Sequence, residues 1–195
     1  MPEGSRPPAI EARATPHLLR GRGGQRPTAI VVHTTAGTYE GTIDWFSRPE
    51  SGVSAHYLVA LDGRVAQFVD EADSARHAGR VLRPTARLVT MREDSPNVYT
   101  VGVEFEDGGD PGSVTRPAAQ YAAGARLIHA IAARWGIPLD CEHVVGHREI
   151  FAAKECPGNL DVERLVAEAR ASAEIIAPAA PRPAAGPASR RSPPR

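Results

Sequence analysis

Two histidines and a cysteine stand where they could bind a metal ion together. His147 lies in the segment 145–150, and Cys156 follows it by nine residues, directly before Pro157. His33 ends an earlier run of β-branched apolar residues. Two imidazole nitrogens and one thiolate are a favourable ligand set for zinc, and three protein ligands leave a fourth position open. Because an open position binds water or a substrate carbonyl, the pattern indicates metal-assisted hydrolysis.

Composition sets limits on what kind of protein this is. The 195 residues are enough for one domain with a core of its own, and 42% of them are hydrophobic. The formal net charge is zero, which gives no support for nucleic-acid binding. No apolar run approaches the roughly 20 residues of a membrane helix. The first residues lack the apolar stretch of a signal peptide, so we expect synthesis in the cytoplasm and, for the two cysteines, free thiols.

Hydrophobic spacing predicts the elements that must position the three ligands. Continuous apolar runs predict strands, and helical spacing of apolar residues predicts helices. The predicted strands are 28–33, 53–60 and 65–69 (a hairpin at an Asp-Gly turn), 98–105 and 143–146; the predicted helices are 42–46, 115–135 and 161–174, the first two beginning at Thr42 and Thr115. Strands mixed with covering helices predict a single α/β domain with a central mixed β-sheet flanked by helices.

The segments outside these elements are rich in proline, glycine and arginine. Residues 1–27 are predicted to form an N-terminal arm with at most one short element, near residues 17–19. Residues 80–97 are predicted to form a long surface loop, and long loops in compact domains are often functional. Residues 176–195 are predicted to be a disordered tail. We expect the basic tail to be either a linker, which we favour, or a contact for anionic polymers or a membrane.

Three segments carry a resemblance to a known family. They are residues 30–37 around His33, residues 53–59 around His56, and residues 146–150 with 154–158 around His147 and Cys156. In this order and spacing the chain resembles the zinc-dependent N-acetylmuramoyl-L-alanine amidases of the amidase-2 or peptidoglycan recognition protein type. That family includes phage lysozymes and recycling amidases. The resemblance implies a peptidoglycan recognition protein-like fold for a catalytic domain at residues 28–175.

The resemblance also implies roles for individual residues. The family's zinc ligands fall on His33, His147 and Cys156, which implies one Zn²⁺ per chain. Phage lysozymes keep a catalytic tyrosine where this chain has Ala55. Recycling amidases use instead a glutamate on a Val-Gly-Val-Glu strand, which falls here on Glu104. The family's lysine two residues before the third ligand falls on Lys154. Glu104 is therefore expected to move the proton and Lys154 to stabilise the oxyanion.

Four further residues are candidates for contact with the substrate. His77 matches a groove-lining segment of recycling amidases, and Asn97 and Arg148 are weaker candidates. His56 is either structural or substrate-lining. The expected substrate is peptidoglycan or a muropeptide, cut at the amide between the muramic acid lactyl group and L-alanine.

Several alternatives remain for the biological role. The first is a wall-lytic enzyme, an endolysin or autolysin, which acts on the cell wall. Cys156 favours this alternative. The second is a cytosolic enzyme that recycles anhydro-muropeptides. Glu104 and the segment around His77 favour this alternative. A third is a peptidoglycan-binding module without catalysis, although non-catalytic members typically lose the cysteine. A fourth is a structural zinc site in an unrelated fold. We expect a monomer.

Overall fold

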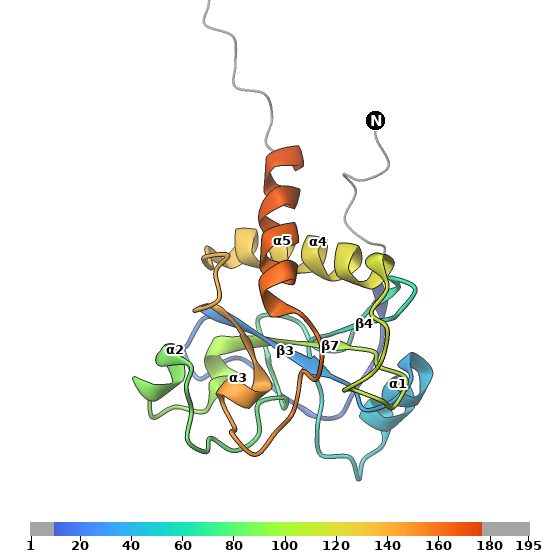
Figure 1. Ribbon diagram of the computed structural model, residues 1–195. Helices are drawn as coiled ribbons and strands as arrows, with labels where there is room; N and C mark the ends of the chain where they lie inside the picture. Colours follow the sequence, from blue (N-terminus) through green and yellow to red (C-terminus); the bar gives the residue numbers. More distant parts are fainter. Residues whose placement is uncertain (1–9, 177–195) are drawn as a thin grey trace, which may run out of the picture.

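One inner strand of the sheet, β3 (Ala29–Thr34), ends one residue beyond His33, the first predicted ligand. In this computed structural model, which describes residues 10–176, six strands form a mixed sheet in the order β1-β5-β4-β7-β3-β8 (Figure 1). Within this sheet, the β4–β5 pair is antiparallel and the other pairs are parallel. The strands are β1 (Ile10–Ala12), β3 (Ala29–Thr34), β4 (Tyr57–Val59), β5 (Val65–Gln67), β7 (Thr100–Phe105) and β8 (Val144–Gly146), while β2 (Leu18–Leu19) and β6 (Ser74–Ala75) pair separately.

Two helices, α4 (Ala118–Trp135) and α5 (Val162–Ile176), cover one face of the sheet (Figure 1). They bury a core with side chains that alternate along the strands, such as Ile30 and Val32 of β3. The alternation follows from the two-residue period of a strand. Gly136 ends α4 with a φ of 69°, a left-handed conformation that glycine adopts without strain.

The opposite face of the sheet carries shorter elements and becomes the face of the functional site. The helix α1 (Tyr39–Ser47) packs there, and the Thr38 side chain caps it by accepting from the Gly41 amide. The short helices α2 (Arg87–Thr90) and α3 (Pro96–Tyr99) come later in the chain, between β6 and β7. Buried Val31 of β3 and Val89 of α2 share a second small core on this face. Because His33 follows Val31 by two residues, its side chain lies on the same face.

The predicted fold class is confirmed, but several predicted boundaries differ. Thr38 and not Thr42 caps α1, and α4 begins at Ala118 rather than at Thr115. The strand predicted for 53–60 is reduced to β4, and the one predicted from residue 98 begins only at Thr100, after α3. The surface loop predicted for 80–97 contains α2. Val89 of this helix is buried because it packs into the apolar cluster on this face of the sheet. No helix among residues 10–176 is long and apolar enough to cross a membrane.

The N-terminal segment is built into the fold more than its composition predicts. β1 pairs in parallel with β5 at the edge of the central sheet. Arg22 is 4% exposed and donates to four backbone carbonyls, those of Glu71, Asn97, Val98 and Thr100. The expectation of one short element before residue 28 was therefore incomplete, since strands this short leave no periodic signal. Residues 1–9 and the predicted tail from residue 177 lie outside the described residues.

A buried carboxylate, that of Glu71, ties the end of α4 to the sheet. It accepts hydrogen bonds from Arg134 and Trp135 at the end of α4 and from the Tyr57 hydroxyl of β4. Burial alone would raise the pKa of Glu71, but these hydrogen bonds outweigh burial and leave the pKa below its ordinary value. A carboxylate with a lowered pKa stabilises the folded state above the pKa it has in the unfolded chain.

We predict that Glu71→Gln lowers the free energy of unfolding at pH 7 by about 2 kcal/mol, because it removes charge-assisted hydrogen bonds from a buried acceptor. The difference from the unsubstituted protein should shrink as the pH falls below about 4.5, where Glu71 becomes protonated in the unfolded chain. Urea unfolding at several pH values measures both effects. Glu168→Gln, which loses an ion pair on the exposed face of α5, is the control and should change stability by less than about 0.5 kcal/mol. Equal effects of the two substitutions would contradict the prediction.

Candidate metal centre and hydrolytic site

Strand register places the first candidate ligand beside the candidate proton carrier. His33 of β3 pairs directly with Glu104 of the parallel strand β7. Val101, Val103 and Phe105 of β7 lie in the core under α4 and α5. By alternation, Glu104 therefore shares with His33 the opposite face of the sheet. Both residues stand near the carboxyl ends of their strands, where open α/β sheets bind their ligands.

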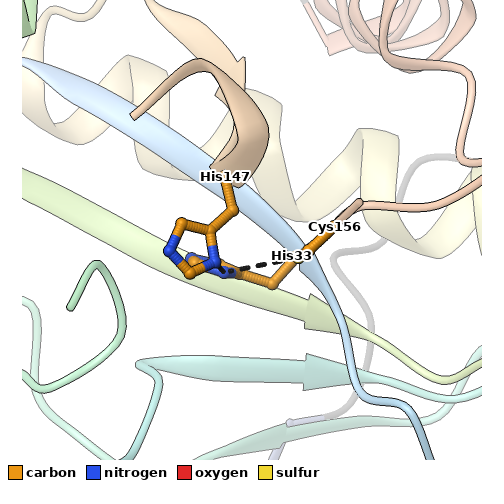
Figure 2. A group of neighbouring side chains, drawn as sticks. All are labelled: His33, His147 and Cys156. Atoms are coloured by element: carbon orange, nitrogen blue, oxygen red, sulfur yellow. Dashed lines mark hydrogen bonds between the residues drawn. The ribbon is translucent and has the colours of Figure 1, made fainter. Parts of the chain in front are cut away.

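A closed loop after β8 brings the other two ligands to the same place. His147 begins a single 3-10 turn (His147–Glu149) directly after β8. The loop returns so that the Arg148 amide donates to the Cys156 carbonyl at 2.8 Å. The Cys156 sulfur then accepts from the Thr34 backbone amide at 3.2 Å, one residue beyond His33. The three side chains point toward one another from β3, from the turn and from the end of the loop (Figure 2).

The geometry of this group fits a tetrahedral metal ion. The His33 Nδ1 and His147 Nδ1 atoms are 3.2 Å apart, and the Cys156 sulfur lies 3.8 Å from His33 Nδ1. All three donor atoms lie within 4.8 Å of one another. Tetrahedral bonds of about 2.0–2.3 Å to nitrogen and sulfur place neighbouring donors about 3.3–3.8 Å apart. The three predicted ligands are thus close enough, and of the right kind, to share one ion.

The outer ring nitrogens of both histidines are also engaged. His147 Nε2 lies 3.0 Å from the Ala78 carbonyl, and His33 Nε2 lies 3.0 Å from Nδ1 of His77. Partners at the outer nitrogen fix the orientation and the tautomer of a ligating imidazole. For His147 the carbonyl can only accept, so Nε2 carries the hydrogen and Nδ1 is left unprotonated toward the other two donors.

Burial determines the charge state of the three donors. It lowers the pKa of His33 well below its usual value, and it lowers that of His147, so both imidazoles are neutral near pH 7. Burial and, to a smaller extent, the negative charge of Glu104 together raise the pKa of the Cys156 thiol to about 12. Neutral imidazoles are ready to bind a metal, whereas the thiol has to lose its proton to a bound cation.

Glu104 has the properties of a proton-transfer group. One of its carboxylate oxygens is buried without a hydrogen-bond partner, and the residue lines the same cavity as the three donors. Burial, aided by the nearby charge of Asp107, raises its pKa to about 8, while Lys154 acts in the opposite direction. A carboxyl group whose pKa lies close to neutrality can both accept and return a proton. A bound cation in this cavity would lower that pKa again.

The cavity has a volume of about 240 Å³ and opens to solvent. Its wall includes the three donors, Glu104, Lys154 and His77, so both predicted catalytic residues face one space with the predicted ligands. Lys154 is exposed and forms no ion pair with any residue between 10 and 176. Arg76, which sequence analysis did not select, also lines the cavity. Only its position beside His77 could have indicated this.

The structure places the other substrate candidates at different depths. His56 is fully buried below the cavity, where Nδ1 accepts from the Gly102 amide, so the structural alternative is favoured. The Asn97 side-chain oxygen accepts the amides of His77 and Ala78, which assigns Asn97 to the support of that segment. Arg148 lies outside the cavity wall, and its guanidinium donates to the Gly158 carbonyl. A substrate contact by Arg148 stays a prediction.

Comparison with known proteins decides the family. A family profile described as N-acetylmuramoyl-L-alanine amidase matches residues 23–159. The chain belongs to this amidase family. The profile ends three residues beyond Cys156 and so includes all three donors, Glu104 and Lys154.

Individual members of the amidase family are similar over different parts of the chain. N-acetylmuramoyl-L-alanine amidase A of Achromobacter lyticus is 37% identical over 111 residues, which are 56% of this chain and 54% of that protein. The chain therefore spans about half the length of this curated relative. A selenomethionine derivative of AmpD has the same fold, with a TM-score of 0.68 at 24% identity over 86% of this chain and 98% of that one.

A second similar structure, the amidase AmiD of E. coli, was solved with a substrate. It is 26% identical, with a TM-score of 0.59 over 78% of this chain and 65% of that one. Its bound substrate is anhydro-N-acetylmuramic acid-L-Ala-D-gamma-Glu-L-Lys.

We predict that Cys156→Ser weakens Zn²⁺ binding by at least about 100-fold, because a hydroxyl replaces a thiolate in a three-ligand site, while the fold is retained. Competition with a chromogenic chelator measures the affinity, and circular dichroism of the metal-free protein checks the fold. Loss of the fold without metal would instead favour the structural-site alternative.

An independent measurement uses the two cysteines of the same molecule. Both thiols are free; Cys141 is exposed, and Cys156 lines the cavity. Saturating Zn²⁺ should slow alkylation of Cys156 and leave the rate at Cys141 unchanged, which peptide mass spectrometry can follow. Equal rates at Cys156 with and without Zn²⁺ would contradict its role as a ligand.

Proposed function

We propose that this protein is a zinc-dependent N-acetylmuramoyl-L-alanine amidase with one Zn²⁺ per chain. It hydrolyses the amide between the muramic acid lactyl group and L-alanine of the stem peptide. One observation carries the proposal: three donors that fit a zinc ion share a cavity with the carboxylate of Glu104, one oxygen of which is buried and lacks a hydrogen-bond partner. Family membership supports the choice of bond, since the family is described by this activity.

The chain's own residues then divide the work of amide hydrolysis. Bound at His33, His147 and Cys156, the ion supplies a Lewis acid that polarises a carbonyl and lowers the pKa of water. Glu104 takes the proton of the attacking water and later returns it to the leaving amine. Lys154 provides a positive charge for the oxyanion that develops on the carbonyl oxygen when water adds to the carbonyl carbon. The exposed position of Lys154 leaves its ammonium free to meet a substrate that enters from solvent.

We infer a wall-lytic role, as an endolysin or autolysin, ahead of the recycling alternative. A cysteine as the third ligand supports the lytic role, because the recycling enzymes that the sequence resembles use aspartate there. Glu104 and the segment around His77 support the recycling role, as does the soluble muropeptide bound to the similar E. coli amidase. Both roles cut the same bond, and they differ in whether the substrate is the intact wall or a soluble fragment.

The deciding experiment compares purified sacculi with a soluble muropeptide, with and without a chelator, and identifies the new amino termini. We expect free L-alanine termini from both substrates, faster release from sacculi, loss of activity with the chelator and recovery with Zn²⁺. Cleavage of the glycan, or activity that survives zinc removal, would refute the proposed reaction. Tight binding to sacculi with no termini released would favour the binding-module alternative.

We predict that Glu104→Gln lowers kcat on the order of 10²–10⁴-fold, the usual contribution of a positioned acid–base group, and leaves the bound zinc in place. The base must be deprotonated, so kcat/KM of the unsubstituted protein should fall as the pH drops through the pKa of Glu104. That pKa is about 8 in the metal-free protein and lower beside a bound cation. Steady-state kinetics and zinc analysis test both parts. Residual activity of the variant that keeps the same acidic limb would rule out Glu104 as the base.

We predict that Lys154→Met lowers kcat on the order of 10²–10³-fold through loss of oxyanion stabilisation. Because Lys154 is exposed and lies outside the donor group, zinc content and the unfolding midpoint should not change. Lys154→Arg keeps the charge and should retain more activity than Lys154→Met. Equal activity of the Met variant and the unsubstituted protein would remove Lys154 from the mechanism.

A further inference from the structure

A chain of hydrogen bonds leads from His33 into the core through His77. His33 Nε2 lies 3.0 Å from His77 Nδ1, and His77 Nε2 lies 3.2 Å from the Thr100 hydroxyl. The Thr100 hydroxyl in turn donates to the Pro96 carbonyl at 2.6 Å. The two rings meet edge to face, with centroids 5.1 Å apart and an angle of 86° between their planes.

The far end of this chain fixes the position of every hydrogen in it. A backbone carbonyl can only accept, so the single hydroxyl hydrogen of Thr100 points to Pro96. The Thr100 oxygen must then accept from His77, which places the His77 hydrogen on Nε2 and leaves its Nδ1 an acceptor. His33 therefore donates from Nε2, and its unprotonated Nδ1 faces His147 and Cys156. Burial keeps both imidazoles neutral, as this order requires, because it lowers their pKa values.

The surrounding backbone is shaped to hold the His77 ring in this place. Gly102 of β7 lies directly beneath it, and a Cβ atom there would come within 2.4–2.7 Å of three ring atoms. The Asn97 side-chain oxygen accepts the amides of both His77 and Ala78, at 3.1 and 2.9 Å. The adjacent Ala78 carbonyl receives the hydrogen bond of His147. Two consecutive residues thus orient both histidine ligands.

We propose that His77 is a positioning residue that holds His33 in the tautomer and orientation required for metal binding; this rests on the proposed zinc site. The role replaces the substrate contact expected from sequence. His77 is 8% exposed, and both of its ring nitrogens already have partners within the protein. No ring nitrogen remains to bind a substrate group. The consequence is a dependence of zinc affinity on a residue that does not touch the ion.

The test compares variants of His77 that differ in the acceptor they present. Removing an outer partner of a ligating histidine typically costs 10–100-fold in metal affinity. His77→Leu removes the acceptor and should weaken Zn²⁺ binding by that factor, as measured by competition with a chelator. In His77→Asn the side-chain oxygen can take the place of Nδ1 and should restore most of the affinity. Thr100→Val removes the group that fixes the His77 tautomer and should weaken binding in the same direction.

His56→Leu is the matched control. His56 is another buried imidazole, which meets His77 edge to face with ring centroids 5.7 Å apart. It contacts none of the three donors. The His56→Leu substitution should destabilise the fold and leave the zinc affinity of the folded protein unchanged. Unfolding midpoints of all metal-free variants separate stability from affinity. Equal zinc affinity of His77→Leu and the unsubstituted protein would overturn the proposal, as would equal losses in the Leu and Asn variants.

A second readout is independent of both catalysis and metal. Nitrogen-15 NMR of the zinc-free protein reports which ring nitrogen of His33 carries the hydrogen. We expect Nε2–H in the unsubstituted protein and in His77→Asn, and a mixture of tautomers in His77→Leu. A hydrogen on Nδ1 of His33 in the unsubstituted protein would overturn the role of His77. Because this measurement needs neither zinc nor substrate, it remains decisive even if the proposed amidase activity fails.

Discussion

The parallel pairing of β3 with β7 is the constraint on which the site depends. Their register sets His33 beside Glu104 and Val31 beside Gly102, and strand alternation turns all four of these positions to the face that α4 and α5 leave uncovered. A slip of one residue in either strand would exchange core and site positions. The side chains of β3 and β7 that are buried under the two helices thus determine which residues face the opposite side of the sheet. The main core and the cavity of the site both follow from this one register.

Burial keeps the groups of the candidate site neutral. Burial disfavours charge on the imidazoles, on the thiol and on the carboxyl group of Glu104 alike. A positive ion reverses this preference, because it favours the thiolate and the carboxylate while it occupies the imidazole lone pairs. The desolvation that disfavours charge on the thiol and on the carboxyl group therefore makes their ionisation depend on a nearby cation.

The sequence predicted which short segments supply the site better than it predicted how deeply individual side chains are buried. His33, His147 and Cys156 follow recognisable short segments, and the central strands have continuous apolar runs, so the donors and the fold class were accessible. The burial of His56 and the inward orientation of Asn97 were not, because both depend on contacts with residues 19 to 46 positions away along the chain. The helical boundaries near Thr100 and Ala118 shifted because a proline near the start of each helix competes with the apolar pattern.

The pairing of β1 has a practical consequence for the design of shortened versions of the chain. The family profile begins at residue 23 and ends at residue 159, so a fragment cut to that match would lack β1, α5 and Arg22. Four backbone carbonyls would lose the guanidinium that now donates to them, and the helix that contributes Leu165, Val166 and Ala169 to the main core would be gone. The unpaired edge of β5 would offer its backbone groups to other chains, a known route to aggregation. The boundaries of similarity are therefore narrower than the boundaries of the folding unit.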